Sequence, residues 1–150
     1  MADDNAPDPA KILKLARQAL TSAEYRKKFR AIDFFEPYPP QQKFFADGAK
    51  FHQRLIRGGN QTGKSRCCAA ELGYHLTGEY PVLWNGRRFT KPIRAWVVGP
   101  TAQLVRDGPQ RQLCSSQGEF GTGTIPLTAL ANAGRPIMVP GGTGAIDTLK

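Results

Sequence analysis

One short glycine-rich segment, residues 58–65, constrains the fold of this chain more than any other feature. Its sequence, GGNQTGKS, fits the pattern G-x-x-x-x-G-K-[ST] at every fixed position, and such a loop holds the phosphates of ATP or GTP. An apolar stretch precedes the loop and a helical pattern follows it. This context favours a phosphate-binding loop over the alternative, a glycine-rich turn with an incidental Lys-Ser pair.

The residue types of this loop suit phosphate chemistry. Gly58 and Gly63 allow a tight backbone that side chains would block, so that consecutive N–H groups can face a β-phosphate. A helix that starts at Gly63 adds the positive end of its dipole. Lys64 would reach the β- and γ-phosphates, and the Ser65 hydroxyl would be a ligand of Mg²⁺. The remaining residues of the expected loop are Gly59, Asn60, Gln61 and Thr62.

The elements around the loop alternate between strands and helices. We expect short buried strands at 51–57 and 93–99, and helices over 63–77 and from Thr101 to about Leu113. This order is typical of a parallel sheet flanked by helices. The predicted fold class is therefore α/β, a P-loop NTPase sheet of the ASCE type. Because only two strands stand out, the sheet is expected to be incomplete at its C-terminal side.

The N-terminal part of the chain is predicted to be helical. A leader over residues 1–8 precedes a helix that starts at Asp8, and a second helix starts at Thr21, where TSAE has the spacing of a capping box. We therefore divide the chain into residues 1–33, with the leader and helices, and residues 34–150, a partial P-loop ATPase domain.

The segment PYPPQQKFF, residues 37–45, is a second candidate site. Its prolines should stop any helix, so we expect only a short one over 41–46 that ends before Gly48. The Gln41 amide can pair with N6 and N7 of adenine, and the Tyr38 ring could cover the base. The alternative is a proline-rich turn with an exposed glutamine. Its position shortly before the phosphate loop favours the adenine interpretation.

The charge and the cysteines limit the classes of function. The chain carries 21 basic and 12 acidic residues, a net charge of +9, which permits contact with nucleic acid; the alternative is a solvated basic surface. Three cysteines suggest neither a disulfide framework nor a zinc site, and we expect buried, reduced thiols inside a cell. No apolar run is long enough to span a membrane, and the acidic N-terminus does not resemble a signal peptide.

Four segments together resemble the N-terminal ATPase region of the large terminase subunit of tailed bacteriophages and prophages. They are PYPPQQKFF, RLIRGGNQTGKSRCCAAELGYHLTGEYP, GRRFTKPIRAWVVGPT and GTGTIP. The resemblance covers about residues 34–128 and is most specific from Arg54 to Thr101. It implies ATP and Mg²⁺ as cofactors, and ATP hydrolysis that drives double-stranded DNA into a procapsid. The family also has a C-terminal, metal-dependent endonuclease domain of RNase H-like fold.

The resemblance further implies partners and residue roles. Residues 58–65 would be the Walker A loop, and Gln41 would read adenine, with Gln42 as the alternative. The implied partners, besides double-stranded DNA, are the portal protein, the small terminase subunit and identical subunits in a ring. The implied location is the cytoplasm of the bacterial host, and transiently the procapsid portal.

The chain departs from the family's pattern in two ways. Many members have an arginine in the loop where this chain has Asn60, so Arg57, Arg66 or a neighbouring subunit would have to stabilise charge during phosphoryl transfer. A Walker B strand, an apolar run that ends in Asp and then Glu, is not found, because AIDTLK has only two apolar residues before Asp147. Without it, Mg²⁺ lacks an anchor and no group positions the attacking water. We therefore expect a fragment that does not hydrolyse ATP alone.

Two other functions fit the same residues. One is a fragment of a helicase-like, nucleic-acid-dependent ATPase, which would continue into a second motor domain instead of a nuclease. The other is a non-catalytic remnant that binds nucleotide or DNA, which ATP turnover would exclude.

Overall fold

The computed structural model describes residues 18, 21–116, 119–130, 137–140 and 144–148. Residues 21–29 are helical, as predicted, whereas the expected leader and the helix from Asp8 fall outside the described residues. The elements that follow are η1 (Ala31–Phe34), α2 (Pro39–Lys50), α3 (Lys64–Thr77), α4 (Ala102–Val105), η2 (Arg106–Gln110), α5 (Arg111–Cys114), η3 (Leu127–Ala129), β1 (Ile137–Met138) and β2 (Ile146–Thr148).

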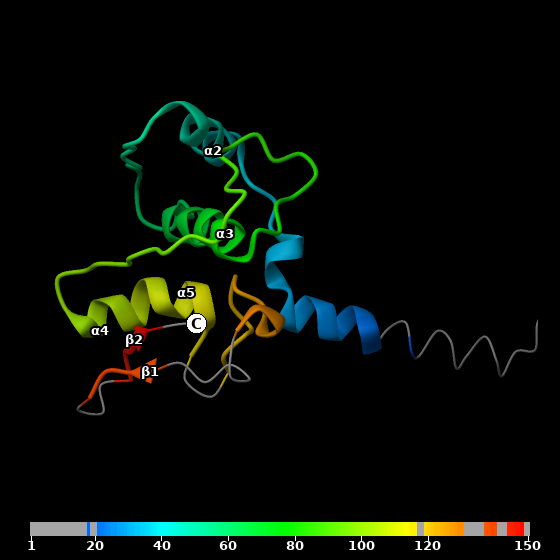
Figure 1. Cartoon of the computed structure of the whole chain (residues 1–150), viewed down its shortest axis with the longest axis vertical. Helices are drawn as coiled ribbons and strands as arrows, with labels where there is room; N and C mark the ends of the chain where they lie inside the picture. Colours follow the sequence, from blue (N-terminus) through cyan, green and yellow to red (C-terminus); the bar gives the residue numbers. More distant parts are fainter. Residues whose placement is uncertain (1–17, 19–20, 117–118, 131–136, 141–143, 149–150) are drawn as a thin grey trace, which may run out of the picture.

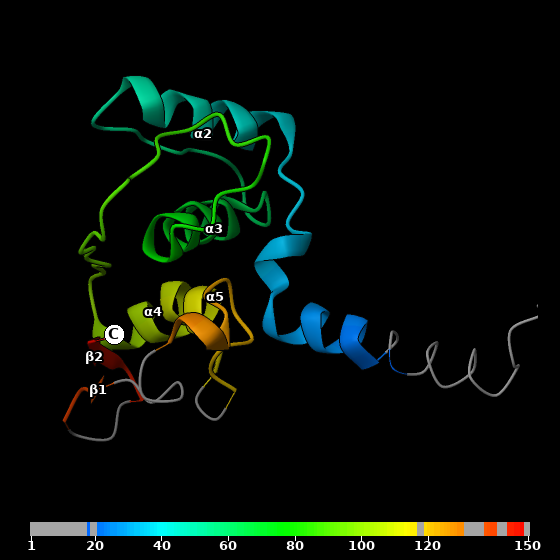
Figure 2. The same ribbon diagram turned by 45° about the vertical axis from the view of Figure 1, so that its right-hand side comes forward.

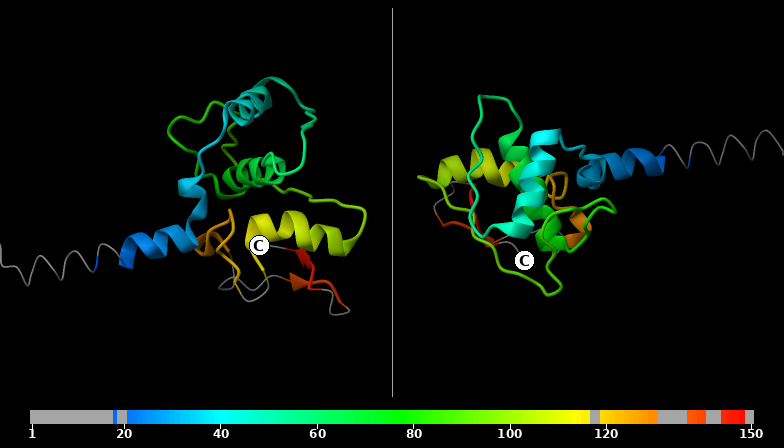
Figure 3. Two further views of the ribbon diagram at one scale, coloured as in Figure 1. Left: turned by 180° about the vertical axis from the view of Figure 1, so that it is seen from behind. Right: turned by 90° about the horizontal axis from the view of Figure 1, so that it is seen from above.

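The helices are arranged in three levels (Figure 1). Helix α3 lies between α2 and the helical run α4–η2–α5, and the turned view in Figure 2 and the view from behind in Figure 3 show the same order. The β1–β2 hairpin lies beside that run, on the side away from α3. None of the helices in the described ranges combines the length and the apolar character of a membrane span.

Helix α2 corrects the expectation that the prolines stop a helix. Pro39 and Pro40 occupy its first two positions, where backbone N–H groups have no partner within the helix, so a residue without an N–H is tolerated. The helix also continues through Gly48, where we expected its end. Gly48 lies at a close contact, since a Cβ there would be 2.9 Å from Arg54 Nη1 and 3.0 Å from Glu71 Oε1.

Helix α3 confirms the helix predicted after the phosphate loop. It ends at Gly78, which has a left-handed backbone with φ of 73° and donates its N–H to Tyr74 O at 2.9 Å. Side chains of α3 belong to two separate apolar clusters, which explains why this helix is buried on several sides. One cluster contains Ala69, Leu113, Cys114, Ile125 and Leu130, and the other contains Ile32, Ala70 and Tyr74.

The helical run after Thr101 is also confirmed. The Thr101 side chain caps it by accepting the N–H of Leu104 at 3.2 Å. Between α4 and α5 the chain widens into a π-helical turn that contains Pro109. Proline has no N–H to donate and its ring crowds the preceding turn, so a widened turn accommodates it within a continuous run.

The two predicted strands, 51–57 and 93–99, are not hydrogen-bonded as strands in the structure. A strand needs a neighbour for its backbone groups, and no described segment pairs with either. Several of their apolar side chains are accordingly exposed, with Leu55 at 77%, Trp96 at 91% and Val98 at 82%. The described residues contain one sheet, the antiparallel β1–β2 hairpin with Ile137 opposite Thr148. The parallel P-loop sheet therefore stays a prediction.

Two of the three thiols are buried, as expected. Cys67 and Cys114 are 0% and 3% exposed, whereas Cys68 is exposed and corrects that expectation. Burial raises the pKa of Cys67 to about 12 and that of Cys114 to about 11, from an ordinary value of 9.0. Well below pH 9 both thiols are neutral in the folded and unfolded states, and as the pH rises the unfolded state loses protons first.

We expect the free energy of unfolding to fall as the pH rises above 9. Each thiol contributes a slope of at most about 1.4 kcal/mol per pH unit, which ends near the folded pKa of about 11 for Cys114 and about 12 for Cys67. Urea denaturation over this pH range measures the slope. Burial also raises the pKa of Cys68 and of Tyr74, so a variant with Cys67→Ala and Cys114→Ala should have a smaller slope that is not zero. An unchanged slope would contradict the assignment.

Candidate nucleotide-binding site

The loop over residues 58–63 connects the extended segment 51–57 to the first turn of α3. Its backbone enters the left-handed region twice, at Gln61 with φ of 60° and at Gly63 with φ of 75°. Gly63 is also the N-cap residue of α3, and a Cβ there would lie only 2.9 Å from Gln41 Nε2. The backbone conformation therefore favours glycine at position 63, and a Cβ there would displace the end of the Gln41 side chain.

Two side chains, one in the loop and one at the first position of α3, bind carbonyl groups of the loop. Thr62 Oγ1 donates to Gly59 O at 2.9 Å, and Lys64 Nζ donates to Gly58 O at 2.9 Å and to Gly59 O. The Lys64 ammonium group has three N–H donors, so one remains after these two bonds. The lysine thus holds a positive charge against the loop, at the N-terminal end of a 14-residue helix.

A cavity of about 620 Å³ lies between the loop and α2. Its volume is within the range of small-molecule sites in proteins. It brings together residues that the sequence separates, because α2 forms one wall and the loop forms the other. The lining residues are Tyr38, Pro40, Gln41, Lys43, Phe44, Asp47, Leu55, Ile56, Arg57, Gly58, Gln61, Thr62 and Lys64.

Gln41 lines this cavity but is only 5% exposed. Its Oε1 accepts the N–H of Tyr38 at 2.9 Å, and its Nε2 donates to Gly63 O at 3.2 Å. Gln42 lies on the exposed side of α2, where its Nε2 donates to Pro37 O at 3.0 Å. Tyr38 is 67% exposed, so its ring is accessible from the cavity.

The two arginines considered for charge stabilisation are placed differently. Arg57 lines the cavity, whereas Arg66 does not, and its guanidinium lies 5.9 Å from the centroid of the Phe35 ring. Asn60 and Ser65 are exposed and lie outside the lining of the cavity. In the part of the chain that the structure describes, no cluster of three or more His, Cys, Asp and Glu side chains is arranged to hold a metal ion.

An ion pair that the sequence did not suggest joins the elements around the loop. Arg54 Nη1 donates to Phe44 O of α2 at 2.6 Å, and Arg54 Nη2 lies 2.9 and 3.0 Å from the two carboxylate oxygens of Glu71 in α3. The guanidinium also lies 4.3 Å from the centroid of the Phe44 ring. Glu71 is 6% exposed, and His75 Nε2 is 3.7 Å from it. In the sequence, only the position of Glu71 among apolar residues of α3 indicated this contact.

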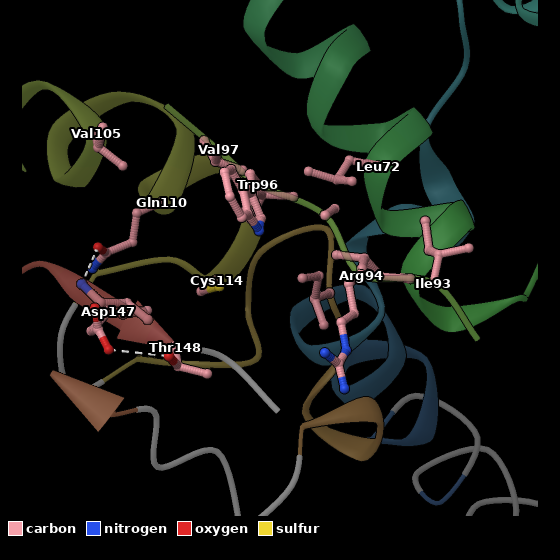
Figure 4. Close-up of a pocket in the computed structure, with 15 residues that line it drawn as sticks. Leu72, Ile93, Arg94, Trp96, Val97, Val105, Gln110, Cys114, Asp147 and Thr148 are labelled. Carbon is pink, nitrogen blue, oxygen red and sulfur yellow. Dashed lines mark hydrogen bonds between the residues drawn. The ribbon is translucent and has the colours of Figure 1, made fainter. Parts of the chain in front are cut away.

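A second cavity, of about 660 Å³, lies on the other side of α3 (Figure 4). It lies among α3, residues 93–97, α5 and β2, and most of its lining is apolar, with Trp96 among the lining residues. At its edge, the Gln110 amide binds the backbone of the hairpin, with Oε1 accepting the N–H of Ile146 at 2.8 Å. No glycine is among the residues that line this second cavity.

Comparison with curated proteins finds the terminase large subunit of Salmonella phage P22, which is 34% identical over 138 residues. The match covers 82% of this chain and 27% of that protein, so the chain spans about a quarter of the length of this relative. No family model matches the chain, and no solved structure matches it.

Proposed function

We propose that this chain, which is similar to the terminase large subunit of Salmonella phage P22 over about a quarter of that protein's length, is the ATP-binding part of a viral DNA-packaging motor. The observation that carries the proposal is the glycine-rich loop at the start of α3, which shares a cavity with α2. In the complete motor, ATP hydrolysis would drive double-stranded DNA into the procapsid.

The loop and the first turn of α3 have the donors and the hydroxyl group that a nucleoside triphosphate with Mg²⁺ would need. The remaining N–H of Lys64 and the backbone N–H groups at the start of α3 are donors for phosphate oxygens. The exposed Ser65 hydroxyl is an oxygen ligand next to the lysine, and Mg²⁺ commonly takes only one or two protein ligands beside phosphates and water. When bound, the ion neutralises phosphate charge. Arg57 is the arginine of this chain that is best placed to add a positive charge at the cavity.

The proposal includes a parallel P-loop sheet in which 51–57 and 93–99 are strands. The exposure of Leu55, Trp96 and Val98 supports it, because these apolar side chains are those that a two-sided sheet would cover. The proposed partners are double-stranded DNA, a portal protein, a small terminase subunit and identical subunits in a ring. The net charge of +9 supports contact with DNA. The proposed location is the cytoplasm of the bacterial host.

Calorimetric titration of the chain with Mg-ATP tests the proposal. We expect one molecule of Mg-ATP to bind per chain, in the micromolar to millimolar range, and AMP to bind much more weakly because the loop acts on the β- and γ-phosphates. A chain that keeps its helical circular dichroism spectrum but binds no Mg-ATP at millimolar concentration would refute the proposal. This test does not depend on turnover.

A further inference from the structure

The Gln41 side chain connects two backbone segments that lie far apart in the sequence. Through Oε1 it binds the N–H of Tyr38 at the start of α2, and through Nε2 it binds the carbonyl of Gly63 at the end of the loop. The residue is 5% exposed. Both ends of the amide therefore already have main-chain partners, and little of its surface is accessible to a ligand.

The Gly63 carbonyl has a direct geometric relation to the phosphate-binding groups. It accepts the N–H of Cys67 at 2.9 Å, the first hydrogen bond of α3, as well as the Gln41 amide. The same peptide unit carries the N–H of Lys64, and in a planar trans peptide the C=O and N–H bonds have opposite directions. A side chain that holds this carbonyl therefore also sets the direction of the Lys64 N–H, one of the donors for phosphate.

We propose that Gln41 is a positioning residue that holds the phosphate loop, and that it is not the residue that reads the nucleotide base. This inference rests on the proposed function, because it assigns a role within the same site. Each end of the amide keeps one unused donor or acceptor, but the bonds to Tyr38 and Gly63 fix its orientation, and only 5% of the residue is exposed. A Cβ at Gly63 would lie 2.9 Å from Gln41 Nε2, which shows how closely the amide approaches the loop backbone.

Three ligands distinguish positioning from base recognition. They are Mg-ATP, Mg-GTP and Mg-tripolyphosphate, which has the phosphates but no base. The variant is Gln41→Met, which keeps nearly the same side-chain volume and removes both hydrogen bonds. We expect it to weaken all three ligands by the same factor, roughly tenfold, in calorimetric titrations. The matched control is Gln103→Ala, an exposed glutamine on α4, which should change each affinity less than twofold.

One outcome of these titrations would contradict the role proposed for Gln41, and another would contradict the proposed function. If Gln41→Met weakens Mg-ATP alone and leaves Mg-GTP and Mg-tripolyphosphate unchanged, Gln41 reads the base and the inference is overturned. If the unmodified chain binds none of the three, the proposed function fails, and the role of Gln41 is then decided by a measurement that needs no ligand.

That measurement is amide hydrogen exchange of the protein without ligand. Gln41→Met should increase exchange across residues 58–66, because the loop and the first turn of α3 lose their contact with α2. Exchange in α5 should stay unchanged, which shows that the variant remains folded. Unchanged exchange across 58–66 would mean that these hydrogen bonds do not hold the loop, and would refute the inference.

Discussion

Replacing Lys64 by alanine is expected to lower the affinity for Mg-ATP by about a hundredfold or more. A lysine that contacts the β- and γ-phosphates makes charge-assisted hydrogen bonds worth about 1.5–3 kcal/mol each, and a hundredfold change corresponds to about 2.8 kcal/mol. In the structure its Nζ already lies within the loop, next to Gly58 and Gly59. The ammonium group therefore needs only a small movement to reach a ligand in the cavity.

The matched control for this variant is Lys50→Ala, because Lys50 is an exposed lysine at the end of α2 and does not line the cavity. It removes the same charge and should change the affinity less than twofold. Thermal unfolding without ligand should be nearly the same for both variants, since the hydrogen bonds of Lys64 to the loop are exposed. If Lys64→Ala binds Mg-ATP within threefold of the unmodified chain, the loop does not bind phosphate as we propose.

Replacing Arg54 by methionine is expected to lower the free energy of unfolding by about 3 kcal/mol. The methionine can fill much of the same space, but it leaves the Glu71 carboxylate buried without its guanidinium partner, and breaking a buried pair from one side costs about 3–5 kcal/mol. The lower end applies because the Arg54 side chain is 21% exposed and the Glu71 side chain 7%. Urea denaturation measures the change.

Two controls separate the ion pair from other effects of this substitution. The double variant Arg54→Met with Glu71→Leu removes both charges and should recover most of the loss, because apolar groups of similar size replace the pair. Lys43→Met breaks the exposed pair with Asp47, whose nitrogen–oxygen distance is 3.1 Å, and should change the free energy of unfolding by less than about 0.5 kcal/mol. Equal losses in the single and double Arg54 variants would contradict the interpretation.

Local patterns predicted those parts of the structure that local interactions determine. The helix after the loop, its glycine cap at Gly78 and the cap at Thr101 each depend on residues within one or two turns, so a single sequence is sufficient to find them. The helix that begins at Pro39 was missed for a related reason, because the same prolines that stop a helix in its interior are tolerated in its first turn.

Contacts between distant segments could not be read from the sequence in the same way. The bond from Gln41 to Gly63 and the pair of Arg54 with Glu71 depend on how α2 packs against α3, which no periodic pattern encodes. The apolar runs at 51–57 and 93–99 predict strands correctly only if neighbouring strands are available to complete their hydrogen bonds. The sequence did place Gln41 near the loop, but its hydrogen-bonding partners became known only from the fold.

The different surroundings of the two tryptophans provide an optical reporter. Trp84 lies among aromatic rings, with its centroid 4.9 Å from that of Phe45 and 5.2 Å from that of Tyr74, whereas Trp96 is 91% exposed. The fluorescence of Trp96 should therefore be shifted to longer wavelength and be quenched readily by iodide, while that of Trp84 should be protected. Any molecule that covers residues 93–99 would shift the emission to shorter wavelength, so the surroundings of this segment can be followed in solution without a label.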